Sequence, residues 1–210
     1  MTPTDYVLHL ILSVLLIVGV YQFYFWCQRN VVEKTYDLSL GIDERIPYWP
    51  SWAWIYSFLY YPMILYINLV VESPREFTHL AISYILLLGL QMIAFILFPV
   101  QTPEHWRSRD ARRGLSEHFL AYVQSIDGRS NCFPSMHCSV AMLTALHLLP
   151  DLGPAIFAFP LLIGFSCLFT KQHFAIDVPG GLALGWATYE LFLILIEPGD
   201  SAADIWQHGL

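Results

Sequence analysis

Two short polar stretches interrupt a strongly apolar chain, and each of them contains a histidine. Residues 131–142 read NCFPSMHCSVAM, with His137 at the start of an apolar run, and residues 170–181 read TKQHFAIDVPGG. In the second stretch His173 precedes Asp177 by four positions, a spacing that places two side chains on one side of a helix. If this stretch is helical, the Asp177 carboxylate lies within hydrogen-bond reach of the His173 ring and can fix its tautomer.

A histidine oriented by a carboxylate, with a second histidine opposite it, supplies the groups for phosphoryl transfer through a histidine nucleophile. His173 would attack phosphorus, while His137 would protonate the leaving oxygen and later take a proton from the incoming hydroxyl. Lys171, Arg129, Ser135 and the backbone amides of the helix after Ser135 would balance the negative charge on the phosphoryl oxygens.

Two histidines and one carboxylate are also ligands that iron or zinc accepts, so a metal site is an alternative at the same residues. The cysteines form neither a CxxC pair nor a cluster with histidine, a pattern that argues against a zinc knuckle or a disulfide scaffold. The cysteine pattern therefore predicts neither of these, and it leaves the metal alternative at His137, His173 and Asp177 open. The four cysteines are Cys27, Cys132, Cys138 and Cys167.

The composition places these groups in a membrane protein. Of the 210 residues, 56% are hydrophobic and only 13% are charged, and the mean hydropathy is +0.52, so the average residue prefers hydrocarbon to water. The net charge of -7 excludes the basic surface of a nucleic-acid-binding protein. The chain has no internal repeat, low-complexity tract or linker, so we expect residues 1–210 to form a single domain.

Six apolar stretches predict an all-α fold, a polytopic bundle of six transmembrane helices. Three of them are long enough to cross about 30 Å of hydrocarbon, and three are shorter or punctuated. The first stretch lacks a basic leader and a cleavage site, so we expect a retained helix rather than a secretory signal. In chain order the stretches are 6–26, 52–71, 80–98, 133–149, 154–169 and 178–196.

Proline and glycine positions indicate how the two histidine stretches join their helices. Pro134 and Pro179 suit the first turn of a helix, and Gly181 with Gly185 forms a small-residue face for close helix packing. A helix that begins at Pro134 leaves its first backbone amides, near Ser135, without intrahelical acceptors. These amides would form a cradle for an anion.

Two further features are expected near the membrane surface. Residues 116–126 predict a short helix, capped by Ser116, that lies in the interface or packs against the rim of the bundle. Aromatic residues around the start of the second apolar stretch predict an interfacial belt, with a role at a lipid headgroup as the alternative. These residues are Trp49, Trp52, Trp54, Tyr56, Tyr60 and Tyr61.

Threading six helices back and forth brings the loops at 27–51, 99–132 and 170–177 to one face of the membrane, which we call the site face. It contains nine of the ten cations. The positive-inside rule makes this face cytoplasmic, whereas cations that bind an anionic substrate say little about topology. The nine cations are Arg29, Lys34, Arg45, Arg107, Arg109, Arg112, Arg113, Arg129 and Lys171.

At the two histidines the chain resembles the type 2 phosphatidic acid phosphatase superfamily. Residues 133–137, FPSMH, look like its Pro-Ser-x-His motif. His173-x-x-x-Asp177, followed by Gly180-Gly181, looks like its third motif. The resemblance covers nearly the whole chain. It implies a six-helix membrane bundle without a metal, and a site on the extracytoplasmic or lumenal side.

Three further segments resemble one branch of that superfamily, which contains inositol phosphorylceramide synthases and many small bacterial members. They are Asn131, the run TKQH at 170–173, and DERIPYWP at 43–50. This branch implies a bacterial cytoplasmic membrane as the location. We favour an extracytoplasmic site face despite the cation count, because most superfamily members that the chain resembles act on the extracytoplasmic or lumenal side and because several of the nine cations can serve to bind phosphate.

The chain departs from the superfamily pattern at two cations. The first motif, Lys-x6-Arg-Pro, is not found after the third apolar stretch, where residues 98–107 read FPVQTPEHWR. The Ser-Arg that usually precedes the third motif reads Ser166-Cys167. We expect replacement cations to bind the phosphate, with Asn131 and Ser135 as polar partners. The candidate cations are Lys171, Arg107, Arg109, Arg112, Arg113 and Arg129.

Together these features predict a membrane-embedded phosphatase or phosphotransferase that acts on a phospholipid or lipid phosphate through a phosphohistidine. A phospho-headgroup transferase of the inositol phosphorylceramide synthase type is the enzymatic alternative, because hydrolysis and transfer share that intermediate. A transporter or lipid-binding protein whose ionisable residues line a path is the non-enzymatic alternative. Membrane lipids are the expected partners and nucleic acid is not one, and the sequence leaves the oligomeric state open.

Overall fold

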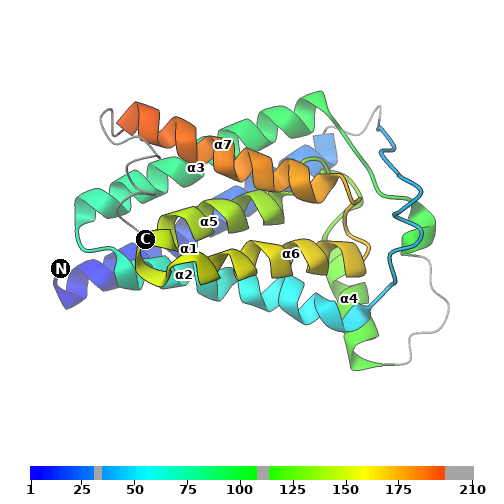
Figure 1. Cartoon of the computed structure of the whole chain (residues 1–210), viewed down its shortest axis with the longest axis horizontal. Helices are drawn as coiled ribbons and strands as arrows, with labels where there is room; N and C mark the ends of the chain where they lie inside the picture. The colour runs from blue at the N-terminus through cyan, green and yellow to red at the C-terminus, as the bar shows by residue number, and fades with distance from the viewer. Residues whose placement is uncertain (31–34, 108–113, 197–210) are drawn as a thin grey trace.

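The computed structural model describes residues 1–30, 35–107 and 114–196, apart from the side chain at 196. These residues form no β-strand beyond one isolated bridge between Tyr36 and Val100, which confirms the predicted all-α class. Four short helical turns accompany the helices, at Pro50–Trp52, Ile55–Leu59, Glu104–Trp106 and Pro154–Phe157. The helices are α1 (Pro3–Asn30), α2 (Tyr60–Val70), α3 (Pro74–Leu97), α4 (Leu115–Ile126), α5 (Met136–Leu152), α6 (Ala158–Phe169) and α7 (Asp177–Ile196), as Figure 1 shows.

Four helical segments of the described chain are long and apolar enough to cross a membrane, as an integral membrane protein requires. They are Pro3–Asn30, Pro50–Val70, Pro74–Leu97 and Asp177–Leu195. The other two predicted spans are shorter. α5 has 17 residues, and Pro154–Phe169 is a shorter apolar helix. At 1.5 Å per residue α5 is about 25 Å long, less than a hydrocarbon core of about 30 Å.

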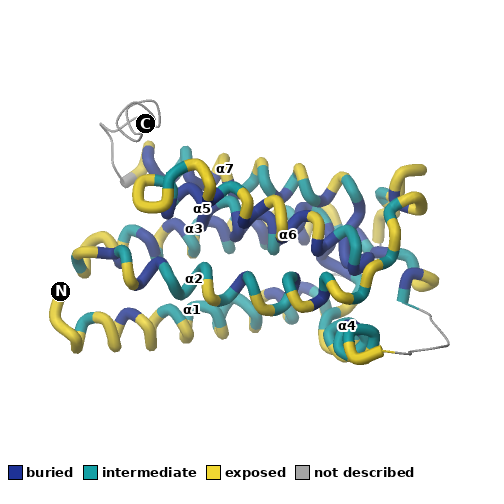
Figure 2. The backbone as a smooth tube through the Cα atoms, turned by 60° about the horizontal axis from the view of Figure 1, so that its bottom comes forward, coloured by how far each residue is buried: buried dark blue, intermediate teal, exposed yellow. Residues whose placement is uncertain are grey.

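The position of α5 explains why a short helix suffices there. It packs against α7, α6, α2 and α3, and most of its residues are buried, as the tube in Figure 2 shows. The opposite holds for α1, which buries only His9, Tyr24 and Cys27 and exposes apolar side chains along its length. Such a helix suits contact with lipid, whereas α5 forms the centre of the bundle.

The predicted small-residue face on the last helix is confirmed. A Cβ added at Gly181 would lie 2.3 Å from the carbonyl oxygen of Ser135, and one at Gly185 would lie 2.3 Å from that of Ser139. Only glycine allows the backbones of α5 and α7 to approach this closely. A buried glutamine adds to the fit, because Gln91 on α3 donates to the Pro134 carbonyl and accepts from the Ser139 hydroxyl.

The starts of two helices differ from the prediction. Ser135 is the N-cap of α5 and accepts a hydrogen bond from the Cys138 amide at 3.4 Å, so Pro134 precedes the helix instead of lying in its first turn. The predicted cap of α4 is also wrong. Gly114 occupies the N-cap position, and the Ser116 hydroxyl instead accepts a hydrogen bond from the Trp54 indole at 2.9 Å. That contact explains why α4 packs beside the start of the second span.

α4 lies across one end of the bundle, nearly perpendicular to the long helices (Figure 1) and seen end-on in Figure 2. The predicted aromatic belt forms only in part near this end. Trp49 is 54% exposed and Trp54 is 37% exposed, whereas Tyr56 and Tyr60 are 4% and 5% exposed. These two tyrosines lie on the side of the second span that faces α5, so they are core residues and not belt residues.

Candidate active site

The loops that were expected on the site face meet at the end of the bundle beside α4 (Figure 1). Backbone hydrogen bonds pair the segment after α3 with the segment before α5. The Thr102 amide donates to the Arg129 carbonyl at 3.0 Å, and the Cys132 amide donates to the Val100 carbonyl at 3.2 Å. The Ser135 amide donates to the Asp177 carbonyl at 3.0 Å and joins the start of α5 to the start of α7. This amide is therefore not free for an anion, contrary to the prediction.

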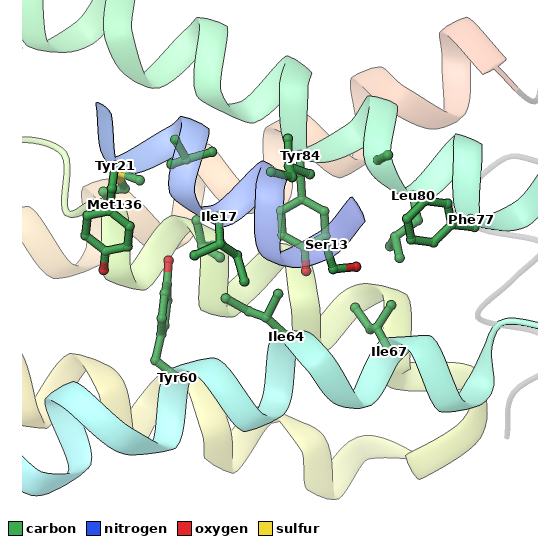
Figure 3. Close-up of a pocket in the computed structure, with 14 residues that line it drawn as sticks. Ser13, Ile17, Tyr21, Tyr60, Ile64, Ile67, Phe77, Leu80, Tyr84 and Met136 are labelled. Carbon is green, nitrogen blue, oxygen red and sulfur yellow. The ribbon is translucent and has the colours of Figure 1, made fainter. Parts of the chain in front are cut away.

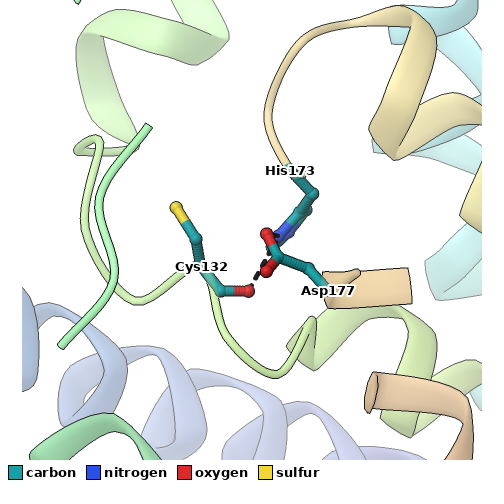
Figure 4. A group of neighbouring side chains, drawn as sticks. All are labelled: Cys132, His173 and Asp177. Atoms are coloured by element: carbon teal, nitrogen blue, oxygen red, sulfur yellow. Dashed lines mark hydrogen bonds and ion pairs between the residues drawn. The ribbon is translucent and has the colours of Figure 1, made fainter. Parts of the chain in front are cut away.

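His173 and Asp177 are neighbours, although the segment between them is a turn and not the expected helix. His173 Nδ1 lies 3.2 Å from Asp177 Oδ2 and 3.0 Å from the carbonyl oxygen of Cys132, as Figure 4 shows. Asp177 Oδ2 also accepts a hydrogen bond from the Phe174 amide at 2.8 Å. Asp177 is fully buried and His173 is 6% exposed, so both groups are held in place.

These contacts determine the tautomer of the neutral His173 ring. A carboxylate and a carbonyl oxygen can only accept hydrogen bonds, so Nδ1 carries the proton that they share. Nε2 then has a free lone pair. A neutral imidazole fixed in this form presents one nucleophilic nitrogen in one direction.

The charge state of the His173 ring depends on two opposing effects. Burial disfavours the charged ring, but the hydrogen bond and the negative charge of Asp177 outweigh burial and raise the pKa of His173 above its ordinary value. Because a protonated ring has no lone pair on Nε2, nucleophilic attack by His173 requires a pH near or above this raised pKa.

His137 lies in the first turn of α5 and faces His173, with 6.2 Å between the ring centroids. Tyr56 and Tyr60 pack on its other sides, with centroid distances of 4.2 and 5.3 Å. One phosphoryl group between the two rings can contact both. The amides of Met136 and His137 open α5 and have no carbonyl four residues earlier in the helix.

Lys171 and Asp43 brace the turn that contains His173. Lys171 Nζ donates to the Asp43 carbonyl and lies over the Trp106 ring at 4.9 Å from its centroid. The Asp43 carboxylate accepts hydrogen bonds from the Ala175 amide and from the Leu40 amide, each at 2.6 Å. Lys171 is 6% exposed. These contacts hold the site loops together, and binding of Lys171 to phosphate stays a prediction.

The other predicted substrate-binding residues also contact the backbone of the site loops. Arg107 donates to the carbonyls at 124, 127 and 128 and to the Gln172 side chain. Asn131 has a positive φ of 60° and donates to the Tyr24 carbonyl at 3.0 Å. Arg129 differs, because its side chain is 34% exposed and pairs with Glu104 at 3.7 Å. Lys34, Arg109, Arg112 and Arg113 lie outside the described residues.

Cys132 brings a thiol to the histidine and carboxylate, contrary to the expectation that no cysteine joins a histidine cluster. Ligand atoms of Cys132, His173 and Asp177 lie within 4.8 Å of one another, close enough for a metal ion. Two observations weigh against this use. Burial raises the pKa of the Cys132 thiol, and the thiol donates to the Arg129 carbonyl at 2.9 Å. A metal needs the thiolate, which this environment disfavours.

Sequence reasoning missed Asp127 as a member of the site. Asp127 follows α4 and accepts hydrogen bonds from Tyr24 at 2.7 Å, Gln28 at 2.9 Å and Tyr56 at 3.3 Å. Its only signal in the sequence is its place directly after the predicted short helix at 116–126. The partners are 103, 99 and 71 positions away, so no local pattern reveals them.

A search of family profiles finds one for the PAP2 superfamily, which matches residues 45–191 and so covers more than half of the chain. The matched region runs from the loop before the second span to α7 and contains His137, His173 and Asp177. The chain therefore belongs to the PAP2 superfamily, as the resemblance predicted, and its members act on phosphate esters. Neither the curated proteins nor the solved structures include a match to this chain.

Proposed function

We propose that this PAP2 superfamily member is a membrane-embedded lipid phosphate phosphatase that forms a phosphohistidine on His173. One observation carries the proposal. Asp177 Oδ2 and the Cys132 carbonyl both lie at hydrogen-bond distance from His173 Nδ1, so Nε2 is the free nucleophilic atom, and His137 lies opposite it. A nucleophile, its orienting carboxylate and a second titratable ring form the set that covalent phosphoryl transfer needs.

In the first step His173 Nε2 forms a bond to phosphorus and the bond from phosphorus to the ester oxygen breaks. The leaving alkoxide takes a proton from His137 Nε2. In the second step water gives a proton to His137 while its oxygen attacks phosphorus, and the bond from nitrogen to phosphorus breaks. The ring of the phosphohistidine is positively charged, because Nδ1 keeps its proton, and Asp177 stabilises that charge.

Positive groups at the site end would balance the phosphoryl oxygens. The first-turn amides of α5 and the positive end of its helix dipole suit an anion between the two rings. Arg129 is the best-placed cation among the described residues that carry a predicted phosphate role, because it is partly exposed and has only a 3.7 Å ion pair to an exposed glutamate. Such an ion pair exchanges its anion at small cost.

Two adjoining cavities support a lipid as the substrate. The first, of about 170 Å³, is lined by His137, Asp127, Tyr56 and apolar side chains of α1, α2 and α4. The second continues between α1, α2 and α3, and shares Tyr21, Tyr60 and Met136 with the first. From Tyr60 to Ile67, a rise of roughly 10 Å along α2, its walls are apolar apart from the hydroxyl groups of Ser13, Tyr21, Tyr60 and Tyr84, which Figure 3 shows.

A hydrocarbon chain fits this path, because its apolar walls offer few hydrogen bonds and its polar end meets a catalytic histidine. The phosphate of the lipid would then lie between the two rings while the chain extends toward the other face of the membrane. α5 and α6 would complete a six-helix bundle with the four longer segments. We place the site on the extracytoplasmic face of a bacterial cytoplasmic membrane.

The test uses purified protein in detergent micelles that contain phosphatidic acid, with assays for free phosphate and for new phospholipids. We expect phosphate release that survives EDTA and is lost with vanadate, together with acid-labile phosphate bound to the parent protein. His173→Ala should lose both signals, and His118→Ala, which removes an exposed histidine on α4, should retain them.

Other results would replace the proposal. Loss of activity in EDTA would indicate a metal site at Cys132, His173 and Asp177. Binding of phosphatidic acid without turnover would indicate a transporter or lipid-binding protein. Transfer of the inositol phosphate group from phosphatidylinositol to a ceramide, with release of diacylglycerol and no free phosphate, would indicate the headgroup transferase.

A further inference from the structure

A second hydrogen-bond chain ends at His137. The Tyr56 hydroxyl lies 3.3 Å from His137 Nδ1 and 3.3 Å from Asp127 Oδ2, and the Tyr56 and His137 rings pack against each other, tilted by 31°, with centroids 4.2 Å apart. Tyr56 lies in the π-helical turn Ile55–Leu59 at the start of the second span. A π-helical turn changes the direction of the side chains it contains, and such turns are frequent at functional sites.

Asp127 is held in place from two other parts of the chain. Its Oδ1 atom accepts hydrogen bonds from the Tyr24 hydroxyl at 2.7 Å and from Gln28 Nε2 at 2.9 Å, both on α1. Its backbone carbonyl accepts from Arg107 at 2.6 Å. Oδ2 is therefore left facing the Tyr56 hydroxyl, and the carboxylate has a fixed orientation.

The donors and acceptors of these groups fix the direction of each hydrogen bond between Asp127, Tyr56 and His137. An ionised carboxylate only accepts, so the single hydroxyl proton of Tyr56 points to Asp127. The hydroxyl oxygen then accepts from His137, whose proton must be on Nδ1. We propose that Asp127 and Tyr56 are positioning residues that keep the His137 proton on Nδ1, so that Nε2 is the atom that exchanges protons with the lipid ester oxygen. This inference rests on the proposed phosphohistidine function.

The two histidines would thus be held in the same tautomer by different means. His173 contacts its carboxylate directly, which suits a ring that must carry positive charge as a phosphohistidine. His137 contacts its carboxylate through a neutral hydroxyl, which stabilises the protonated ring less. A weaker hold suits a group that must give a proton in one step and take one in the next.

Several other titratable groups surround His137 and contribute to its titration. Tyr60 packs on the ring from the same span, His173 with Asp177 faces it from the turn before α7, and Tyr24 on α1 lies behind Asp127. Cys138 follows it on α5, and Cys167 lies on α6 near Ser135. A test of the hydrogen bonds from Asp127 through Tyr56 to His137 must therefore change Tyr56 and Asp127 without changing the other groups.

Nitrogen-15 NMR of the histidines gives a readout that does not require turnover. In the parent protein with a neutral His137 ring, the His137 signals should show the proton on Nδ1. Tyr56→Phe should give a mixture of both tautomers, while its ring still packs against His137. Tyr60→Phe removes a hydroxyl from the other tyrosine against His137 and should leave the tautomer unchanged. A parent His137 with its proton on Nε2 would overturn the inference.

The pH dependence of phosphatidic acid hydrolysis gives a second readout. In Tyr56→Phe the apparent pKa that His137 contributes to the pH profile of kcat/KM should fall by roughly 0.5 to 1 unit, because the protonated ring loses an acceptor backed by a carboxylate. Asp127→Asn should move it in the same direction by less, and Tyr60→Phe should not move it. If the apparent pKa of His137 is unchanged in both Tyr56→Phe and Asp127→Asn, the positioning role of Tyr56 and Asp127 is refuted.

The two assays separate the positioning role of Tyr56 and Asp127 from the proposed function on which it rests. A parent protein without phosphohistidine on His173 but with the Nδ1 proton on His137 would leave the hydrogen-bond chain intact and refute the proposed function. Phosphohistidine in the parent protein, together with an unchanged His137 tautomer in Tyr56→Phe, would support the proposed function and refute the positioning role of Tyr56.

Discussion

Replacement of Asp177 by asparagine isolates the charge of the carboxylate from its shape. Oδ2 accepts from His173 and from the Phe174 amide, and an amide oxygen can make both contacts. Oδ1 accepts from no described residue, so an amide nitrogen placed there displaces no donor. We therefore expect Asp177→Asn to fold, to keep the Nδ1 proton of His173 in place, and to lose mainly the negative charge.

The expected loss follows from the intermediate. The phosphohistidine ring is positively charged, and a hydrogen bond from a charged ring to a carboxylate contributes about 1.5 to 3 kcal/mol, against about 1 kcal/mol for a neutral pair. Because the asparagine oxygen keeps the neutral contact, the loss is the difference, about 0.5 to 2 kcal/mol, and phosphoenzyme formation should slow about 2- to 30-fold. Rapid-quench measurement of p-nitrophenol release from p-nitrophenyl phosphate reports that step directly.

The pH profile provides the second half of the test. Asp177 raises the pKa of His173 against the effect of burial, so its loss should leave burial dominant and lower that pKa. Attack needs the neutral ring, and the acid limb of kcat/KM should therefore move to lower pH in Asp177→Asn. A slower phosphorylation step with an acid limb that stays in place, or moves to higher pH, would refute the assigned role of Asp177.

Further predictions concern packing, the cations and topology. Gly181→Ala should lower the midpoint of thermal unfolding in detergent, because its Cβ would lie 2.3 Å from a carbonyl of α5, whereas Gly89→Ala has nothing within 4 Å and should not lower it. Arg129→Ala should reduce kcat/KM roughly 10- to 150-fold with little change in that midpoint, whereas Lys171→Ala should lower both, and the reverse pattern would exchange their roles. In a background without native cysteines, Arg45→Cys should react with an impermeant thiol reagent in intact cells; labelling only after lysis would place the site face in the cytoplasm.

The helices and the three candidate catalytic residues, His137, His173 and Asp177, could be predicted from the sequence because their signals are local. An apolar run of the length of α1 or α3 indicates a membrane helix without knowledge of its neighbours. The spacing of Gly181 and Gly185 on one helix face indicates close packing in the same way. His173 and Asp177 are adjacent in the structure, although the reason first given for it was wrong: a turn closed by the Phe174 amide joins them, and not a helix.

The features that the sequence did not reveal depend on contacts between distant segments. Tyr56 lies in an aromatic run that resembles an interfacial belt, and only the packing of the second span against α5 shows that its ring is buried on His137. Asp127 is a single acidic residue after a short amphipathic helix. Its importance becomes visible when α1 supplies Tyr24 and Gln28 to the same carboxylate. Neither residue belongs to a periodic pattern.

The predicted cations show why charge alone does not assign a role in such a site. The site loops pass through the protein interior at the end of the bundle, where their carbonyl oxygens need donors that water cannot supply. Arg107 supplies donors to three carbonyls, and Lys171 supplies one to the Asp43 carbonyl. A cation used in this way stabilises the loops that hold His173 and His137. We propose that direct contact with phosphate comes from exposed groups such as Arg129 and from the first amides of α5, which is the division that the variants of Arg129 and Lys171 are designed to test.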